Sequence, residues 1–487
     1  MQNSTNDSDI PDDVLGSHNN QHWINGHRRA KGTLSSAPLP ALAVPHSPLA
    51  KQNNLILVLG FALIIMLGTI LLRLPIAATD RTLTWSEAFF TATSATTVTG
   101  LAVITTATDL SLFGQIVVLL LIEVGGVGFI TFSILLFTLI GRRIGIGERL
   151  LLQQSLGVLE TMRIGRLAQG VLGVTLAIQF VGAFLLWLRW FPTLGVAPAA
   201  YQAVFHSVSA FCNAGFDLFA GTGTVLFGFG RDPFTLGVLM LLILIGGVGV
   251  LVMSDLITYP WDRRLSVHTR LTLVITGALT LGGAALILAD ELFAGRALSD
   301  MSFGERTLVA LFSSVAARTA GLTIFPIEQL SQASALVVMA LMFIGGAPAS
   351  MAGGVTISTV GVIWVTVLST VRGQPQGVIF GRVFPLETIA KAVAIMSVST
   401  VICFLVTLVL LADQPGALLP IAFEVISAFS NTGYSVGETT HLSEFGRLLI
   451  ALTMFWGRLG PLTLVILLAQ VEHPSLARYP SERIVIG

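Results

Sequence analysis

The sequence is poor in charged side chains. Asp, Glu, Lys and Arg make up 11% of its 487 residues, whereas a soluble globular domain carries about 25%. Acidic and basic residues balance at 26 each, so no positive excess indicates a nucleic-acid partner. Hydrophobic residues make up 54% of the chain. The composition excludes an ordinary soluble enzyme and indicates a protein surrounded by membrane lipid.

Cysteine is also scarce, and catalytic motifs are missing from the sequence. The two cysteines, Cys212 and Cys403, lie in apolar stretches, which is typical of buried, unreactive thiols. No group of Cys and His has the spacing of a metal site. No nucleotide-binding signature or nucleophile motif occurs either. We therefore expect that the protein is not an enzyme and that this chain binds no nucleotide itself.

The sequence contains long runs of apolar residues. A bilayer core needs about 20 apolar residues per helix. Eight runs of that kind predict an all-α polytopic membrane protein; they lie near residues 54–74, 112–140, 167–190, 234–259, 270–289, 334–369, 388–411 and 446–470. The run at 334–369 is too long for one helix and is interrupted by Gly, Pro and Ser. We expect residues 1–53 to form a disordered cytoplasmic tail and residues 471–487 to form a second cytoplasmic tail.

The distribution of Lys and Arg predicts the orientation of the chain. With both termini inside, 17 of the 26 basic residues fall in inner segments and 7 in outer segments. This excess follows the positive-inside rule, so we expect a multi-pass protein of the cell membrane with cytoplasmic N- and C-termini. The remaining two, Arg318 and Arg458, fall inside the hydrophobic region, where charge is costly and usually functional.

Four short segments between the spans resemble one another. Each has a large apolar residue ten positions before a Gly and an Ala five positions before it. The segments read FTATSATTVTGL (90–101), FHSVSAFCNAGF (205–216), LFSSVAARTAGL (311–322) and FEVISAFSNTGY (423–434). One such segment alone would indicate a turn that caps a short helix. Four aligned copies predict a repeated unit of span, re-entrant segment and span.

These units divide the chain into four parallel repeats, at residues 54–145, 167–262, 268–372 and 386–470. In each re-entrant segment we expect a half-helix that enters from outside and is followed by extended backbone. Irregular backbone is tolerated at membrane depth only where it lines a wet cavity or is buried in protein. Four such segments around one axis predict a pore in which carbonyl oxygens replace the hydration shell of a cation.

A second glycine motif follows each re-entrant segment. It reads GGVG at 125–128 and 246–249, GGAP at 345–348 and GRLG at 457–460. Close helix packing is enough to explain the first two copies. The third copy continues as GGAPASMAGGVT (345–356), whose Pro and Gly residues oppose a regular helix. We expect a loop under the re-entrant segments there, with a packing kink as the alternative.

Ionisable residues at membrane depth are further candidates. A central Arg costs about 2.5–3.5 kcal/mol on insertion scales, so Arg458 is expected to repel a cation below the pore or to hold the loop, with a structural ion pair as the alternative. Arg318 is expected to clamp nearby carbonyls or an acidic partner. We place Glu424 at the start of the fourth half-helix, and Glu123 as a cation contact or a salt-bridge partner.

With these motifs the sequence resembles the Trk/Ktr/HKT superfamily of potassium transport proteins, from about residue 54 to the end. It is most similar to the KtrB branch, the membrane subunit of the Ktr potassium uptake system, because it has eight spans with no additional pair in front. The terminal HPSLARYPSERIVIG (473–487) and the WGRLGPL at 456–462 also resemble that family.

The resemblance implies potassium uptake through a selectivity filter whose carbonyls bind K⁺. By this resemblance the filter residues are Thr97, Val98, Thr99, Gly100, Asn213, Ala214, Gly215, Thr319, Ala320, Gly321, Asn431, Thr432 and Gly433. Because all four glycine positions hold Gly, the resemblance implies selectivity for potassium. It also implies one strong K⁺ site rather than a complete row of K⁺ sites. The resemblance leaves transport of Na⁺ possible.

The resemblance also implies an intramembrane gate and protein partners. The gate residues would be Gly345, Gly346, Pro348, Ser350, Gly353, Gly354, Thr356 and Arg458. The family commonly has Lys where this chain has Thr356. The implied partners are a second copy of the chain and a cytoplasmic ring of nucleotide-binding, KtrA-like regulatory subunits. Basic inner loops with Arg142, Arg143, Arg263 and Arg264 are candidates for docking that ring, with plain positive-inside topology as the alternative.

A secondary transporter for another solute is the competing function, with its site formed by broken helices. Inverted repeats would favour a secondary transporter. The repeats here run parallel, because each unit starts inside and carries its re-entrant segment outside.

Overall fold

A computed structural model describes residues 48–127, 164–219, 225–294, 301–348, 350–374 and 376–460. They belong to one unit of the chain, Ser47–Gly487, and a separate unit is Met1–His46. The predicted C-terminal tail and most of the N-terminal tail therefore lie outside the described residues. The first helix begins at Pro48, and the tail boundary at residue 53 stays a prediction.

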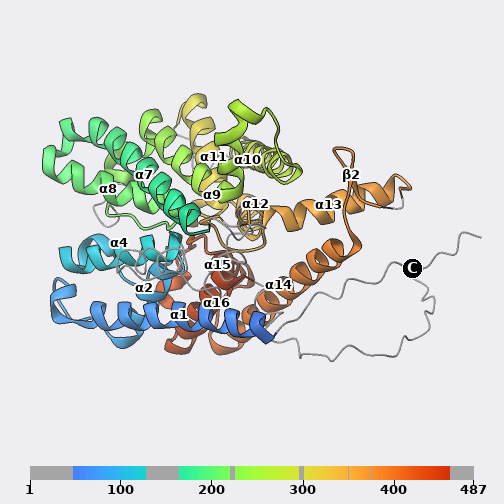
Figure 1. The fold of residues 1–487 in the computed structure, drawn as a ribbon. Helices are drawn as coiled ribbons and strands as arrows, with labels where there is room; N and C mark the ends of the chain where they lie inside the picture. Colours follow the sequence, from blue (N-terminus) through green and yellow to red (C-terminus); the bar gives the residue numbers. More distant parts are fainter. Residues whose placement is uncertain are drawn as a thin grey trace, which may run out of the picture. The chain divides into compact units, whose positions relative to one another are not determined.

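The described chain is almost entirely helical, which confirms the all-α prediction (Figure 1). The α-helices are α1 (Pro48–Arg73), α2 (Trp85–Thr96), α3 (Thr106–Asp109), α4 (Leu112–Val127), α7 (Ile164–Leu194), α8 (Val196–Cys212), α9 (Pro233–Asp262), α10 (Val267–Ala294), α11 (Phe303–Ala317), α12 (Gln332–Phe343), α13 (Ile357–Val371), α14 (Leu386–Asp413), α15 (Leu418–Ser430) and α16 (Glu444–Leu459). Short 3₁₀ turns are η1 (Pro75–Ala77), η2 (Val225–Arg231), η3 (Ile327–Gln329) and η4 (Glu438–His441). Strands β1 (Val378–Ile379) and β2 (Arg382–Val383) pair antiparallel between α13 and α14.

Four described helices are long and apolar enough to cross a membrane: Gly170–Leu194 of α7, Pro233–Trp261 of α9, Val267–Phe293 of α10 and α14. Their outward faces carry large apolar side chains, such as Phe180 at 72% exposure and Leu281 at 67%. Such exposure is typical of contact with lipid. The predicted run at 334–369 divides into α12 and α13, as its Gly and Pro residues indicated. The predicted spans 112–140 and 446–470 continue beyond the described residues, so the count of eight stays a prediction.

Four short helices lie where the sequence predicts half-helices. These are α2, α8, α11 and α15, and each ends three or four residues before one of the aligned glycines. Each contacts the first and the second helix of its own predicted repeat, in the pairs α2 with α1 and α4, α8 with α7 and α9, α11 with α10 and α12, and α15 with α14 and α16. Each also contacts the second helix of another of the four predicted repeat units, in the pairs α4 with α8, α9 with α11, α12 with α15, and α16 with α2. The last pair closes a cycle between the two ends of the described chain, and Figure 1 shows α16 (red) near α2 (blue).

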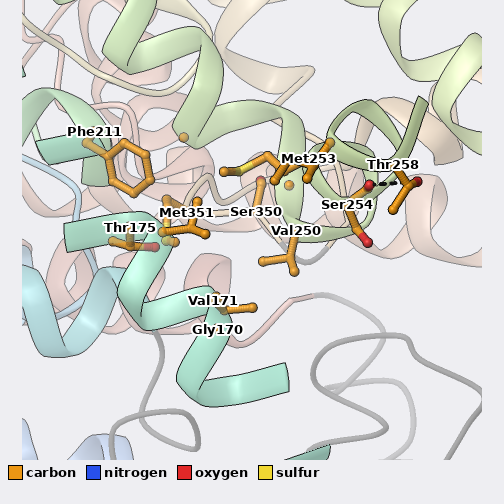
Figure 2. A pocket seen from close by; sticks show the side chains of 14 residues that line it. Gly170, Val171, Thr175, Phe211, Val250, Met253, Ser254, Thr258, Ser350 and Met351 are labelled. Atoms are coloured by element: carbon orange, nitrogen blue, oxygen red, sulfur yellow. Dashed lines mark hydrogen bonds between the residues drawn. The ribbon is translucent and has the colours of Figure 1, made fainter. Parts of the chain in front are cut away.

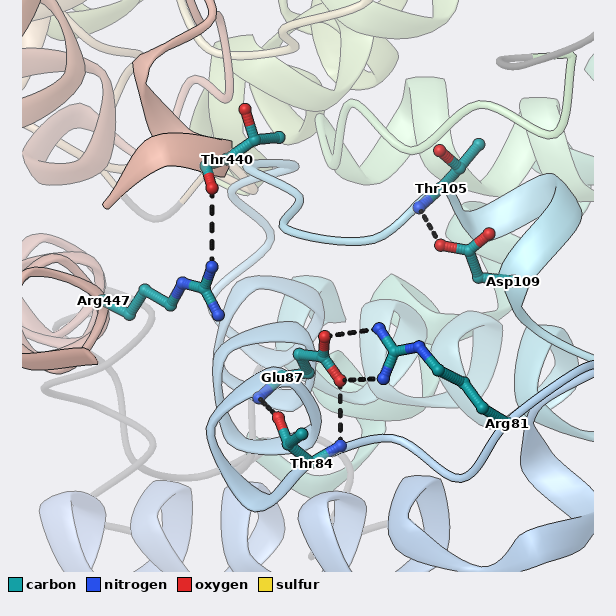
Figure 3. A network of polar contacts seen from close by, with 7 residues as sticks. All are labelled: Arg81, Thr84, Glu87, Thr105, Asp109, Thr440 and Arg447. Atoms are coloured by element: carbon teal, nitrogen blue, oxygen red, sulfur yellow. Dashed lines mark hydrogen bonds and ion pairs between the residues drawn. The ribbon is translucent and has the colours of Figure 1, made fainter. Parts of the chain in front are cut away.

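The start of α2 is fixed by a polar network (Figure 3). Thr84 caps the helix: its hydroxyl accepts from the Glu87 amide at 3.2 Å, and the Glu87 carboxylate accepts from the Thr84 amide at 2.8 Å. Arg81 donates to both carboxylate oxygens of Glu87, at 2.8 and 2.6 Å. The Arg81 guanidinium is the main reason that the pKa of Glu87 falls from 4.5 to about 2, and the bonds from Thr84 lower it further.

This network predicts a pH-dependent stability. The depressed pKa means that Glu87 stabilises the fold fully above pH 4.5 and loses that effect as the pH falls toward 2. Glu87→Gln is therefore expected to lower the free energy of unfolding in detergent at pH 7, by about 1 kcal/mol. Its stability should also fall less than that of the wild type between pH 5 and pH 3. Parallel curves for the two proteins over this pH range would contradict the assignment.

Candidate functional site

The four aligned glycines form a closed ring of close backbone contacts, which we call the glycine ring: Gly100, Gly215, Gly321 and Gly433. A Cβ added to any one of them would collide with the carbonyl oxygen that precedes the next glycine of the ring. The distances are 2.5 Å from Gly100 to the oxygen of Ala214, 2.8 Å from Gly215 to Ala320, 1.9 Å from Gly321 to Thr432 and 2.1 Å from Gly433 to Thr99. The four segments therefore follow one another in a cycle, with no room for side chains between them.

All four ring glycines have positive φ, at 91°, 70°, 59° and 90° in chain order. L-residues with a side chain rarely adopt this region, so both the contacts and the backbone conformation require Gly here. Two residues earlier, Val98, Asn213 and Asn431 also have positive φ, at 58°, 60° and 53°. Such a conformation is a clear outlier for the β-branched Val98, and the surrounding contacts must hold it in place.

In three of the four segments a serine at the same aligned position connects the short helix to the chain at the ring, and this role was not predicted from the sequence. Six positions before the ring glycine, the hydroxyls of Ser94 and Ser427 accept from the amides of Gly100 and Gly433, at 3.0 and 3.1 Å. Ser209 occupies the same position and donates to the Phe216 carbonyl at 2.7 Å. The signal was present, because Ser stands at this position in three of the four aligned segments. The third segment has Val there.

Side chains of the predicted filter residues bond to one another and to the backbone of α16. Thr97 and Thr99 share a hydroxyl contact of 2.8 Å. The Asn431 amide donates to the Thr99 hydroxyl at 2.9 Å and to the Met454 carbonyl at 2.8 Å. The structure also buries Asn213, Ala214, Thr319, Ala320 and Thr432, each at 3% exposure or less. Backbone carbonyls are thus left as the polar groups of the ring.

In three of the four units the second glycine motif brings the following helix against the end of the short helix. An added Cβ would lie 1.8 Å from the Thr96 carbonyl oxygen at Gly125, 1.9 Å from that of Phe211 at Gly246, and 2.0 Å from that of Phe429 at Gly457. These three carbonyls all stand four residues before a ring glycine. Close packing was expected for the first two copies. The structure adds a break at Gly249 (φ 82°) inside α9, which that expectation did not include.

The third copy forms a loop between α12 and α13, as the sequence predicts. Its two ends are joined, since the Gly345 amide donates to the Val355 carbonyl at 2.9 Å. Its middle is attached to α9: the amides of Ala347 and Met351 donate to the carbonyls of Gly247 and Gly246, at 3.0 and 3.2 Å. A helix interrupted at Gly249 leaves carbonyls of the preceding turn without helical partners, and the loop amides take two of them.

The far side of the loop lies under the fourth re-entrant segment. An added Cβ on Gly353 would lie 2.1 Å from the Asn431 side-chain oxygen, and Gly354 has a φ of 76°. Thr356 is the N-cap residue of α13, and its hydroxyl lies 2.9 Å from that of Thr359. Gly346 packs on Ser350 and Ala352 within the loop. Pro348 is followed by Ala349, which is outside the described residues.

Arg458 connects the loop to the first repeat. Its guanidinium donates to the carbonyl of Met351 in the loop and to the carbonyls of Gly125 and Gly126 in α4, the latter two at 2.5 and 3.1 Å. Within the described part of the chain, no acidic side chain lies within ion-pair distance of Arg458. Arg458 therefore contacts the loop and α4 through backbone carbonyls, and its role in holding the loop stays a prediction.

The other ionisable candidates have different surroundings from those expected. Arg318 donates to the Thr280 hydroxyl at 3.4 Å, and no described acidic side chain or filter carbonyl binds it. Glu123 accepts from Gln179 at 2.9 Å and forms no salt bridge with any described residue. Glu424 lies in the middle of α15 rather than at its start, so the helix-terminus argument for it is wrong.

A cavity of about 220 Å³ lies between α7, α9 and the loop (Figure 2). Ser350 and Met351 of the loop face it, together with Phe211 at the end of α8. Ser254 and Thr258 of α9 also line the cavity, on the side away from Phe211 in Figure 2. The cavity therefore borders the loop at Ser350 and Met351, beside the hydrogen bonds that attach the loop to α9.

The fold and the ring together define a helical membrane protein whose short helices converge on backbone carbonyls. The family model described as TrkH, cation transport protein, matches residues 46–479. The chain belongs to this family, which confirms the resemblance. It is 35% identical to the Ktr system potassium uptake protein B of Bacillus subtilis, over 89% of this chain and 96% of that protein.

Two further comparisons agree. The chain is 33% identical to the potassium/sodium uptake protein NtpJ of Enterococcus hirae, over 88% of this chain and 96% of that protein. The crystal structure of the potassium transporter TrkH from Vibrio parahaemolyticus covers 91% of this chain and 87% of its own, with a TM-score of 0.68 and 20% identity. That likeness shows the fold.

The close contacts of the second motif predict opposite signs for one substitution at two sites. Gly125→Ala is expected to lower the free energy of unfolding in detergent by about 1–3 kcal/mol, because its Cβ would collide with the Thr96 carbonyl. Gly277→Ala in α10 should instead raise it by about 0.5–1 kcal/mol, because no atom lies within 4 Å of its Cβ. Equal effects at the two sites would refute the close approach.

Proposed function

We propose that the protein carries K⁺ across the cell membrane into the cytoplasm, and that the glycine ring is its selectivity filter. The observation that carries this proposal is the closed cycle of the four glycines, in which each collides, if given a Cβ, with the carbonyl before the next. Backbone carbonyls in such a ring can replace the hydration shell of a cation. Relatives at 35% and 33% identity are named as potassium uptake proteins.

The short helices support the same proposal through their direction. The C-terminal ends of α2, α8, α11 and α15 lie three or four residues from the ring glycines. A helix carries a partial negative charge at its C-terminal end, so four such ends favour a cation at the ring. The membrane potential supplies the driving force, at about 2.3 kcal/mol per charge per 100 mV. The repeats are proposed to be the four parallel units of the sequence analysis.

The loop at residues 345–356 and Arg458 are proposed to form the gate. The loop is held by α9 on one side and by Arg458 on the other. An ion leaving the ring would meet both the loop backbone and the Arg458 charge. Opening would require the loop to leave the carbonyls of Gly246 and Gly247 and the guanidinium of Arg458, and the cavity beside Met351 offers space for that movement.

Regulation is proposed to come from other subunits. Relatives are named as parts of a Ktr system, which supports a second component. We propose a homodimer bound to a cytoplasmic, nucleotide-binding, KtrA-like ring, with Arg263 and Arg264 among the residues that dock it and both termini of this chain on that side. Na⁺ as a second transported or stimulating ion is supported by the printed name of NtpJ.

Ion flux into liposomes tests the filter. Wild type is expected to pass K⁺ and Rb⁺ in preference to Na⁺. Gly100→Ser should lower the K⁺/Na⁺ flux ratio by about tenfold or more, because a Cβ there lies 2.5 Å from the Ala214 oxygen and displaces it. The matched control is Gly277→Ser, whose Cβ meets nothing within 4 Å. A wild type without Rb⁺ flux, or an unchanged ratio in Gly100→Ser, would reject the proposal.

Substitution of Arg458 tests the gate. Arg458→Gln removes the charge and the forked contacts with Met351 and α4, so we expect K⁺ flux at a fixed potential to rise several-fold. Arg458→Lys keeps the charge but not the fork. A rise in both variants would assign the gate to the contacts, and a rise in Arg458→Gln alone would assign it to the charge. Unchanged flux and K⁺ affinity in Arg458→Gln would exclude a gating role.

A further inference from the structure

Two of the four re-entrant segments carry a polar connection behind the glycine ring, and the other two do not. The connected side chains stand at equivalent positions: nine residues before the ring glycine, in the short helix, and two residues after it. In the second unit they are His206 and Asp217, with His206 Nε2 2.8 Å from Asp217 Oδ1. In the fourth unit they are Glu424 and Ser435, and the Ser435 hydroxyl donates to the Glu424 carboxylate. We call these pairs the two ties.

In the second unit the histidine of the tie is fully buried, and Asp217 is partly exposed. His206 is 0% exposed; it stacks on Phe219 with 4.8 Å between the ring centroids and meets Trp190 edge-on at 5.4 Å. Its Nδ1 lies 2.8 Å from the Gln202 carbonyl, which can only accept, so Nδ1 carries a proton. The contact of Nε2 with the carboxyl then needs a further proton, on either the imidazole or the carboxyl. The same Asp217 oxygen accepts from the Phe219 amide at 2.7 Å.

The tie in the fourth unit uses hydroxyls and an amide in place of a histidine. Glu424 is 1% exposed, and no described basic side chain lies within ion-pair distance of it. Its carboxylate accepts from Ser435, from the Val436 amide at 3.1 Å and from the Thr439 hydroxyl at 2.6 Å. All of these donors lie in the chain that leaves the ring. The carboxylate therefore fastens that chain to the middle of α15.

The equivalent positions of the other two units cannot form such a connection. They hold Thr91 with Ala102 in the first unit and Phe312 with Thr323 in the third, and neither Ala nor Phe has a polar side-chain atom. The close contacts order the ring as Gly100, Gly215, Gly321, Gly433 and back to Gly100. The second and fourth units are therefore opposite each other, so the two ties face each other across the ring.

We propose that the two ties are positioning elements that set the width of the glycine ring and thereby its discrimination between K⁺ and Na⁺. This inference rests on the proposed function of the ring as a filter. Carbonyl oxygens select among cations only while they stay at the separation that suits one of them. A tie holds the residues just beyond Gly215 or Gly433 against a buried short helix, so the adjoining carbonyls cannot close on a smaller ion.

The test measures K⁺ and Na⁺ flux into liposomes for the full-length protein and its variants. Asp217→Ala breaks the tie of the second unit and is expected to lower the K⁺/Na⁺ flux ratio by about tenfold, the effect of losing one hydrogen bond to a charged group. Ser435→Ala removes one of the three donors to Glu424 and leaves the Val436 and Thr439 bonds, so the ratio should fall by less than tenfold. Asp217→Asn should lower the ratio by less than Asp217→Ala, because one atom of Asp217 contacts both His206 and the Phe219 amide, and the amide of Asn can keep only one of these two bonds with a neutral His206.

The matched control is Ser443→Ala, which removes a hydroxyl that donates to Asp413 and caps α16 away from the ring. It is expected to reduce stability without changing the flux ratio. If Asp217→Ala does not fold, Ser435→Ala decides alone, since it removes a single hydroxyl. A wild-type ratio in the tie variants while Gly100→Ser loses selectivity would overturn the ties and leave the filter standing. A wild-type ratio in Gly100→Ser would instead count against the filter.

Discussion

The structure depends on four stretches of backbone that approach one another with no side chain between them. At each ring glycine the missing Cβ is replaced by a carbonyl oxygen of the next segment. Such an approach concentrates acceptors without donors, which is unfavourable in an apolar interior unless a cation or water balances them. The surrounding elements can be understood as a support for this arrangement: short helices that stop before the ring, serines that bind the ring amides, and second-motif glycines that let the next helix press on each short helix.

The loop under the ring follows from the same packing. Three of the second glycine motifs receive a carbonyl from the end of a short helix, but in the third unit the chain leaves the helix and Gly345 instead meets Gly353 of the loop. The loop then takes its hydrogen bonds from a broken helix of the second unit and from Arg458 of the fourth. Arg458 also donates to the Gly125 carbonyl of α4 in the first unit. The loop of the third unit is therefore connected to the second unit directly, to the fourth through Arg458, and to the first through the same side chain.

Sequence alone predicted the parts of the site that have a signature in residue type. Aligned glycines can be found by their spacing, and Pro348 with its neighbouring glycines marks a loop. The order of the units around the ring could not be predicted, because it is a contact between segments more than 100 residues apart. The partners of Arg458 are backbone carbonyls, which any residue supplies, so an acidic partner was an open alternative. Glu424 was misplaced because the fourth short helix begins at Leu418, earlier than its apolar segment indicated. The break at Gly249 could not be predicted either, because it depends on the loop that packs against α9.

The central claim is that a cation binds among the carbonyls of Thr99, Ala214, Ala320 and Thr432. Anomalous diffraction from crystals of the protein grown with Rb⁺ tests it most directly, because Rb⁺ replaces K⁺ and can be located without ambiguity. The account predicts the strongest Rb⁺ peak inside the glycine ring, and its loss in crystals of Gly100→Ser. Rb⁺ peaks elsewhere in the membrane region, with none inside the ring, would contradict it.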